Sequence, residues 1–328
     1  MNGVLIIDKP AGLTSHDVVN RARRILQQRS IGHLGTLDPM ATGVLPLVTG
    51  SLTRLAQFYT TSEKCYEGTI RFGFSTDTYD AQGDPTSAPQ SIVLRPDEIE
   101  LLATRFRGLI EQTPPAFSAK KIQGVPAYKL ARKQKEVVLK PVQVEIKEFE
   151  ILHVETDRVR FRARVTSGTY MRSVAYDMGQ ALGCGAHLES LRRTAVAEFT
   201  LDDAHTLDEL AKYCHPDRSF AFPKGKGIEV EGPCVEPGAP SFSRSSPEGG
   251  DIESLETFFV HPRELLPEFP SVTADEPTAA RIRSGRTVNL PELSRARQVK
   301  VFAGQRELLA IATRIAGTLF HPKLVFSS

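Results

Sequence analysis

The sequence predicts an α+β protein with a mixed, largely antiparallel sheet, and three observations indicate this class. Apolar and β-branched residues recur at strand spacing in several separate segments. Stretches with helical spacing lie between them, without the regular alternation of strand and helix that a doubly wound fold shows. The chain has 328 residues and a hydrophobic fraction of 40%, so it can bury a substantial core, and we expect roughly two domains.

The N-terminal segment predicts a strand followed by a helix. Residues 4–7 form an apolar, β-branched run that residues 8–10 interrupt, which indicates a buried strand entering a loop. Thr14 or Ser15 can cap a helix, and we expect this helix to run to about Arg29 because apolar residues after the cap recur at helical spacing.

The middle of the chain mixes both kinds of element. Residues 66–74 alternate in the manner of a strand, and residues 142–164 contain two further strand-like stretches with charged residues interleaved. Residues 101–109 and 170–182 have the spacing of helices. Strands and helices therefore alternate irregularly, as α+β proteins allow.

The composition changes near residue 219. Residues 219–255 are rich in Pro, Gly, Ser and charge and cannot bury enough apolar surface to offset their ordering entropy, so we expect a flexible linker or insertion. Residues 279–285 then predict a short helix that ends at glycine. Strand-like segments follow at residues 299–302, 308–315 and 319–326. A small β-rich module, residues 256–328, closes the chain.

Charge and cysteine content narrow the class of protein. Lys and Arg number 41 against 39 Asp and Glu, so the formal charge of +2 does not by itself indicate a nucleic-acid partner. The four cysteines are far apart and form no Cys-x-x-Cys pair, which argues against a zinc ribbon and a disulfide framework. We find no charged leader and no run of about 20 apolar residues, and we expect a cytoplasmic protein without a membrane partner.

One carboxylate lies in an unusual loop sequence. Residues 32–47 surround Asp38 with glycines, prolines and small residues. Pro39 disfavours the helical conformation for Asp38, and the glycines permit turns and close approach of a ligand. A plain turn is the ordinary interpretation of Asp-Pro beside glycine, but this run is far longer than a turn needs.

Three other features are candidates for chemistry. Tyr66 lies at the start of a predicted strand, where a tyrosine is most often a core or rim aromatic. Arg172 lies in a first helical turn, which the helix dipole disfavours, so we expect an anionic partner such as a carboxylate of the same chain. Residues 183–194 form a glycine-rich segment ending in two arginines, which fits a structural turn and a phosphate contact equally well.

The sequence predicts neither a metal nor a cofactor. Residues 76–85 are acidic and contain glycine, but they lack the alternating ligands and closing glutamate of a calcium loop, so an acidic turn is favoured. The eight histidines show no metal-ligand spacing. Phosphate-binding and dinucleotide-binding glycine patterns are not found.

Taken together, these segments resemble the TruB family of tRNA pseudouridine synthases. Residues 32–43 are similar to the catalytic motif of that family, and other motifs recur in the family's order across about two-thirds of the chain. These are residues 8–15, Lys64 with Tyr66, and residues 76–83, 114–121, 168–172 and 184–193. The C-terminal segment is similar to the small RNA-binding PUA domain of these enzymes.

The resemblance implies a fold, a reaction and a domain organisation. The reaction is the isomerisation of uridine to pseudouridine at position 55, in the T loop of tRNA, without a cofactor. Residues 1–218 correspond to the catalytic domain, in which the basic stretch at about 115–140 is an insertion that clamps the T arm. Residues 219–255 are the linker, and residues 256–328 the PUA-like domain. Phe117 stands where relatives often have tyrosine.

The resemblance also implies roles for single residues. Asp38 corresponds to the nucleophile, Arg172 to its ion-pair partner, and Tyr66 to the residue that stacks on the target base and is the candidate proton acceptor. The remaining substrate-binding residues are Tyr170 and Leu191, which line the uridine pocket, and His33, which contacts the T loop.

Two other functions stay open, and a third is less favoured. A guide-RNA-dependent relative shares the aspartate motif but works in a protein assembly, whereas the basic insertion and short C-terminal module favour a stand-alone enzyme. An RNA-binding or RNA-folding module is compatible with catalysis. A glycoside hydrolase needs a second carboxylate at a defined separation, and none accompanies Asp38. We expect tRNA as the partner, no obligate protein partner and a monomer.

Overall fold

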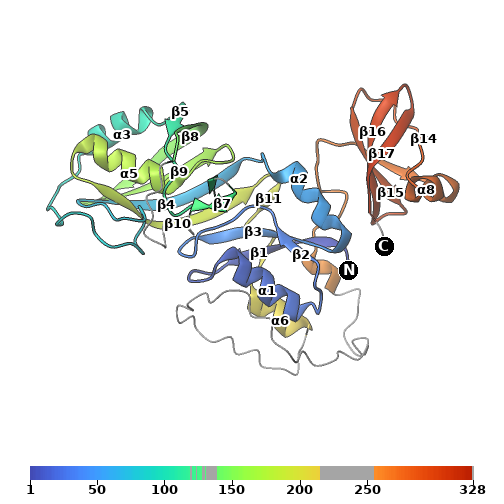
Figure 1. Cartoon of the computed structure of the whole chain (residues 1–328), viewed down its shortest axis with the longest axis horizontal. Helices are drawn as coiled ribbons and strands as arrows, with labels where there is room; N and C mark the ends of the chain where they lie inside the picture. The colour runs from blue at the N-terminus through green and yellow to red at the C-terminus, as the bar shows by residue number, and fades with distance from the viewer. Residues whose placement is uncertain (119, 123, 128–129, 131–138, 215–254, 327–328) are drawn as a thin grey trace.

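Two large β-sheets organise the part of the chain that the structure describes (Figure 1). The computed structural model describes residues 1–118, 120–122, 124–127, 130, 139–214 and 255–326. The larger sheet runs β12-β1-β3-β10-β4-β9-β8-β5, with β2 beside β3 and β11 beside β10. Its strands are β1 (Gly3–Lys9), β2 (Ile31–His33), β3 (Thr42–Thr49), β4 (Lys64–Phe72), β5 (Gly108–Gln112), β8 (Val142–Val154), β9 (Arg158–Val165), β10 (Ala186–Val196), β11 (Phe199–Thr200) and β12 (Ala204–His205).

The larger sheet is mixed and largely antiparallel, as the sequence predicts. The pairs β1 with β12 and β3 with β10 are parallel, and its other strand pairs are antiparallel. β10 is central because it pairs with β3 on one side and with β4 on the other. The predicted fold class is confirmed.

Helices cover the larger sheet and complete its core. They are α1 (Ser15–Ile25), η1 (Gly50–Leu55), α2 (Ala56–Tyr59), α3 (Pro96–Thr104), α5 (Met171–Leu182) and α6 (Leu207–Cys214). α1 packs on α6, and α5 packs on β10. A continuous apolar core joins one side of α1, α3 and α5 to strand residues such as Ile70 and Phe161. Two lobes of the sheet are thereby held on either side of its centre (Figure 1).

Several predicted elements are confirmed, and two predicted helix ends are wrong. Thr14 caps α1 through a capping box with Asp17, but the helix ends at Ile25, because Gln27 adopts a left-handed conformation with φ of 49°. The helix predicted to reach residue 109 ends at Thr104, because Gly108 (φ 85°) turns the chain into β5.

The glycine-rich segment before the two arginines is shorter than its sequence suggests. Gly183 caps α5 in the left-handed region and Gly185 follows at φ of 73°, and β10 begins at the next residue. The part from Ala186 onward is therefore a central strand. Its charged residues obscure the strand pattern in the sequence, because Arg193 is completely buried at a position where an apolar residue is expected.

A second, five-stranded sheet forms the C-terminal module, in the order β13-β15-β16-β17-β14. Its elements are β13 (Ser271–Ala274), α8 (Glu276–Arg283), β14 (Val288–Asn289), β15 (Gln298–Ala303), β16 (Glu307–Ala316) and β17 (Leu319–Val325), preceded by η2 (Glu256–Phe258). The predicted strands at its end are confirmed. The predicted linker 219–255 lies outside the described residues except for residue 255.

The predicted basic clamp, at about residues 115–140, lies only partly within the described residues. A two-stranded ribbon of β6 (Lys121–Ile122) and β7 (Val125–Pro126) is described there, whereas residues 131–138 are not. The domain boundaries predicted from the sequence stay predictions.

The C-terminal module shares a core with the larger sheet. Side chains of β1, β3 and η1, such as Ile6 and Leu52, pack in one cluster with Leu265, Phe302 and Leu324. A polar contact adjoins it: the Tyr59 hydroxyl donates to Glu198 Oε1 at 2.6 Å, and the Leu266 amide donates to the same oxygen at 2.9 Å.

We predict that the two sheets unfold in one cooperative transition. Phe302 has no exposed area and lies in the shared cluster, so Phe302→Ala is expected to lower the free energy of unfolding by about 3–5 kcal/mol. Denaturation followed by circular dichroism measures this. Leu293→Ala is the control, since Leu293 is 89% exposed in the same module. Two separate transitions, of which Phe302→Ala moves only one, would contradict the shared core.

Candidate active site

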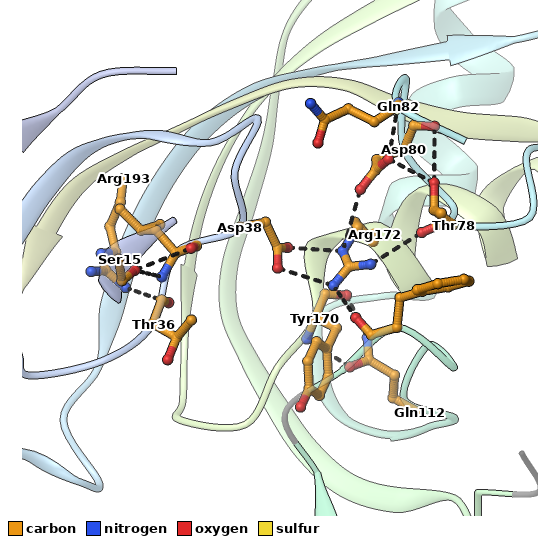
Figure 2. A network of polar contacts seen from close by, with 12 residues as sticks. Ser15, Thr36, Asp38, Thr78, Asp80, Gln82, Gln112, Tyr170, Arg172 and Arg193 are labelled. Carbon is orange, nitrogen blue, oxygen red and sulfur yellow. Dashed lines mark hydrogen bonds and ion pairs between the residues drawn. The ribbon is translucent and has the colours of Figure 1, made fainter. Parts of the chain in front are cut away.

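Asp38 lies in the loop between β2 and β3, and buried groups from other elements hold that loop (Figure 2). The Ser15 hydroxyl, at the start of α1, donates to the Leu37 carbonyl at 3.1 Å and accepts from the Leu37 amide at 2.8 Å. On the other side of Asp38, the Pro39 carbonyl accepts from Lys9 Nζ at 3.2 Å and from the Gly12 amide at 2.8 Å. The backbone on both sides of the carboxylate is therefore fixed.

Arg193 is the third anchor of the loop. Its guanidinium donates to three backbone carbonyls, those of Val44, Thr36 and Gly35, at 2.8, 3.2 and 3.1 Å. A buried cation is stable only when its donors are satisfied, so these carbonyls must stay in place. Of the two interpretations of the paired arginines, a structural role and a phosphate contact, Arg193 therefore has the structural role. Arg192 forms a bidentate ion pair with Asp8, and its side chain is 42% exposed.

Two glycines of the motif are required by this geometry. Gly35 and Gly43 have φ of 103° and 99°, in the region that side chains disfavour. A Cβ on Gly43 would lie 2.1 Å from the Arg193 carbonyl oxygen, because β3 and β10 approach closely there. Gly43 therefore lets the strand that carries Arg193 pass directly beside the Asp38 loop.

The structure brings Asp38 and Arg172 together. Arg172 Nη2 donates to Asp38 Oδ1 at 3.1 Å, and Nε lies 2.9 Å from Oδ2. The Arg172 side chain is 5% exposed and that of Asp38 is 34% exposed. The arginine is thus a buried, fixed partner, whereas the carboxylate keeps an open side toward solvent.

Arg172 is itself held by backbone from two other segments. It donates to the Thr78 carbonyl at 3.1 Å and to the Phe117 carbonyl at 2.9 Å. It lies in the first turn of α5, next to Tyr170, whose amide and carbonyl both bond the Gln112 side chain. Phe117 stands where relatives often have tyrosine, and because Arg172 contacts the backbone carbonyl of Phe117, this contact does not need a tyrosine hydroxyl.

Asp80 is a site residue that the sequence analysis missed. Its side chain is 7% exposed, and its Oδ2 lies 3.8 Å from Arg172 Nε, while its Oδ1 accepts from Thr78 and from the Gln82 amide (Figure 2). The acidic turn that the sequence predicts at residues 76–85 is confirmed. An arginine in a first helical turn indicates that negative charge lies around it, but that signal does not say which acidic residue supplies the charge.

Tyr66 and Tyr170 lie on either side of this network. Tyr66 is on β4, opposite Arg193 in the strand pairing and 7% exposed, and its hydroxyl interacts with the Arg193 guanidinium. Tyr170 is half-buried. Burial raises its pKa, while a hydrogen bond with Ser118 and the nearby charge of Arg172 act in the opposite direction. The Tyr170 phenol is therefore neutral at physiological pH.

Leu191 lines a cavity of about 380 Å³ beside the site. Its other walls include Met40 and Thr42 from the Asp38 loop, and Gly68 and Phe161 from neighbouring strands. Asp38, Tyr66, Tyr170 and Arg172 are not among its lining residues. Of the candidate residues, Leu191 thus lies in an adjacent hollow, and His33 lies at the end of β2, five residues before Asp38.

Buried cations surround the carboxylate. Burial lowers the pKa of Lys9 to about 8 against the opposing attraction of Asp38, and burial with Arg193 nearby lowers that of Lys64 to about 8. Burial, Arg193 and His16 lower the pKa of His33, so its imidazole is neutral at physiological pH. The positive field around Asp38 therefore comes from Arg172, Arg193 and Lys9.

Metal and membrane features can be tested on the described residues. Within them, no three His, Cys, Asp or Glu side chains gather closely enough to hold a metal ion. The described helices include none long and apolar enough to span a bilayer.

Comparisons with known proteins identify the family. Residues 23–171 match the model of the TruB family pseudouridylate synthase N-terminal domain, and residues 172–219 match that of the tRNA pseudouridylate synthase B C-terminal domain. The chain is 46% identical over 328 residues to the tRNA pseudouridine synthase B of Solibacter usitatus, covering 99% of this chain and 100% of that protein. The chain belongs to the TruB family. It is accordingly a tRNA pseudouridine synthase, an isomerase.

Other TruB relatives and solved structures agree with this. The tRNA pseudouridine synthase B of Aquifex aeolicus is 44% identical over 219 residues, 66% of this chain and 76% of that protein. A structure of an H/ACA RNP bound to a substrate RNA containing 2'-deoxyuridine has the same fold, with a TM-score of 0.65 at 24% identity, covering 99% of this chain and 85% of that chain. A Cbf5-Nop10-Gar1 complex matches with a TM-score of 0.63 at 26% identity, covering 96% and 79%.

We predict that Gly43→Ala displaces the Asp38 loop of this TruB enzyme. The added Cβ meets backbone at 2.1 Å and cannot be accommodated by a side-chain movement. Gly304→Ala is the matched control, since Gly304 also has positive φ but open space around it, and should cost only about 1–2 kcal/mol. Thermal denaturation and pseudouridine formation are measured. Equal effects of the two changes would contradict the packing argument.

We predict a pH-dependent gain in stability from Asp177→Asn. Burial on α5 raises the pKa of Asp177 from 3.8 to about 6. The carboxyl is neutral in both states below pH 3.8, whereas above pH 6 the folded state carries a buried charge, so the native protein loses stability as pH rises through this window. The variant should therefore have the higher Tm at pH 8, with a smaller difference at pH 4.5. A Tm difference of equal size at both pH values would contradict this.

Proposed function

We propose that this enzyme isomerises the T-loop uridine of tRNA, at position 55, with Asp38 as the nucleophile. The observation that carries the proposal is the pair of Asp38 and Arg172. A carboxylate that is 34% exposed is held by an arginine that is 5% exposed. Such a carboxylate is oriented by its ion pair yet accessible to a substrate, which is what nucleophilic catalysis requires.

The chemistry needs few groups. The bond between C1' and N1 of the uridine breaks, a bond between C1' and C5 forms, C5 loses its proton, and N1 gains one. No electrons are gained or lost overall, so the balance calls for a carboxylate and a proton acceptor only. We assign the first role to Asp38 and the second to Tyr66, which lies on β4, beside the strand that carries Arg193.

The substrate base must leave the RNA stack to reach Asp38. We assign Tyr170 and Leu191 to the walls that hold it, and His33 to contact with the T loop. The half-buried Tyr170 ring lies beside Arg172 (Figure 2), and Leu191 lines the adjacent cavity. Met40, in the same cavity wall, lies two residues after Asp38, so a base held there is near the carboxylate.

RNA contact outside the pocket is assigned to the C-terminal module. We propose residues 256–328 as the PUA-like RNA-binding domain, after the catalytic domain of residues 1–218 and the linker of residues 219–255. Its support is a set of exposed arginines, Arg281, Arg286, Arg295 and Arg297. Guanidinium groups suit phosphate contacts that position RNA without reading its sequence.

We predict that Asp38→Asn abolishes pseudouridine formation and leaves tRNA binding nearly intact. The amide keeps the size of the side chain but cannot act as a nucleophile. Unmodified tRNA and a T-arm stem-loop are incubated with the purified protein alone, and pseudouridine is mapped by sequence position. Asp97→Asn on α3 is the matched control, since Asp97 is exposed and lies far from the site in sequence.

The outcomes separate the alternatives. Product at the T-loop uridine, made without guide RNA or protein partners, supports the proposal and excludes a guide-dependent enzyme. Loss of tRNA binding as large as the loss of activity in Asp38→Asn contradicts the assigned role. Absence of product from wild-type protein with both RNAs would sink the proposal, and an RNA-binding or RNA-folding function would then be favoured.

A further inference from the structure

One face of α5 contacts the loop of residues 76–83 at two successive helical turns. Arg172 and Tyr176 are four residues apart on this helix, so their side chains lie on the same face. Arg172 donates to the Thr78 carbonyl at 3.1 Å. The Tyr176 ring stacks on the ring of the next loop residue, Tyr79, with centroids 3.9 Å apart and planes inclined by 18°. Thr78 and Tyr79, which are consecutive in the loop, thus contact residues on successive turns of α5.

Tyr79 has an unfavourable backbone conformation for its side chain. Its φ is 65°, in the left-handed region that a bulky residue seldom occupies. Glycine or asparagine is the usual choice at such a position. The surrounding structure must therefore offset this cost, and the stacked ring of Tyr176 is the direct side-chain contact that does so.

The backbone of Tyr79 connects the two partners of Arg172. Residue 78 supplies the carbonyl that accepts from the guanidinium, and residue 80 supplies the carboxylate 3.8 Å from Nε. The Tyr79 carbonyl accepts from the Leu188 amide at 3.0 Å, and its amide donates to the Thr76 carbonyl at 3.2 Å. A rotation of the chain at Tyr79 would move the Thr78 carbonyl and Asp80 together relative to Arg172.

We propose that Tyr79 and Tyr176 form a positioning pair for catalysis, whose ring stack sets the Thr78 carbonyl and Asp80 against Arg172 and thereby orients Asp38. The inference rests on the proposed function of Asp38 and Arg172. Neither tyrosine contacts Asp38, so the pair acts through Arg172. The pair is expected to affect the rate of the chemical step and to leave the affinity for tRNA unchanged.

The test compares two variants that remove the stack in different ways. Tyr176→Ala removes the ring from α5. Tyr79→Gly removes the ring from the loop and at the same time relieves the backbone cost at positive φ. Single-turnover pseudouridine formation and tRNA Kd are measured for each. Both variants are expected to lower the single-turnover rate about tenfold with the Kd unchanged. Tyr176→Phe and Tyr79→Phe should recover most of that rate.

A purely structural role gives a different result. Glycine suits φ of 65°, so a loop that needs only its backbone shape would make Tyr79→Gly as active as wild type and at least as stable. That outcome overturns the proposal. Tyr213→Ala is the matched control, because Tyr213 packs on Phe258 with ring centroids 4.9 Å apart, in another part of the fold. A fall in rate no larger in Tyr176→Ala than in this control also overturns it.

A double-mutant cycle shows whether the stack acts through Asp80. If it does, Tyr176→Ala should cost much less in an Asp80→Asn background than in wild type. Independent, multiplicative effects would contradict the route through Asp80. Asp38→Asn is assayed in parallel: full activity of that variant refutes the proposed function itself, whereas an inactive Asp38→Asn with a fully active Tyr79→Gly refutes only the positioning pair.

Discussion

The structure around the site depends on one ion pair, between Asp38 on a loop and Arg172 at the start of α5. Its two partners come from opposite lobes of the large sheet, and each is fixed by groups other than its partner. Three anchors, Ser15, Lys9 and Arg193, hold the backbone of the loop. Two backbone carbonyls hold the arginine. Because neither group can move far, the carboxylate can face solvent and stay oriented.

Burial of so many cations near one carboxylate has a physical cost that the loop itself offsets. A buried charge is stable only when its hydrogen-bonding groups are satisfied. Arg193 and Lys9 donate to backbone carbonyls in the loop and at the start of β3, so the contacts that satisfy these buried cations also fix the loop. The Asp38 carboxylate is left with Arg172 as its ion-pair partner and keeps an exposed side.

The position of this ion pair also depends on the strands around it. β10 carries Arg193 into the site and also pairs with β4, which carries Tyr66, so both reach the site through one strand register. On the other side, the apolar faces of β1 and β3 form a common core with the C-terminal module. β3, which follows the Asp38 loop, is therefore restricted by its pairing with β10 and by its packing on the C-terminal module.

Local chemistry was readable from the sequence by itself. Helix caps, β-branched runs and glycine positions predicted most elements and the fold class, and the ordered motifs indicated the family and directed attention to Asp38 and Arg172. Their contact is seen in the structure, while the catalytic roles stay predictions. Tertiary structure alone decided that Asp80 faces Arg172, that Arg193 is an anchor, that Leu191 lies in an adjacent cavity, and that Tyr79 stacks on Tyr176. The physical reason is that such contacts join residues distant in sequence, and their partners depend on strand register and helix placement, which local spacing does not encode.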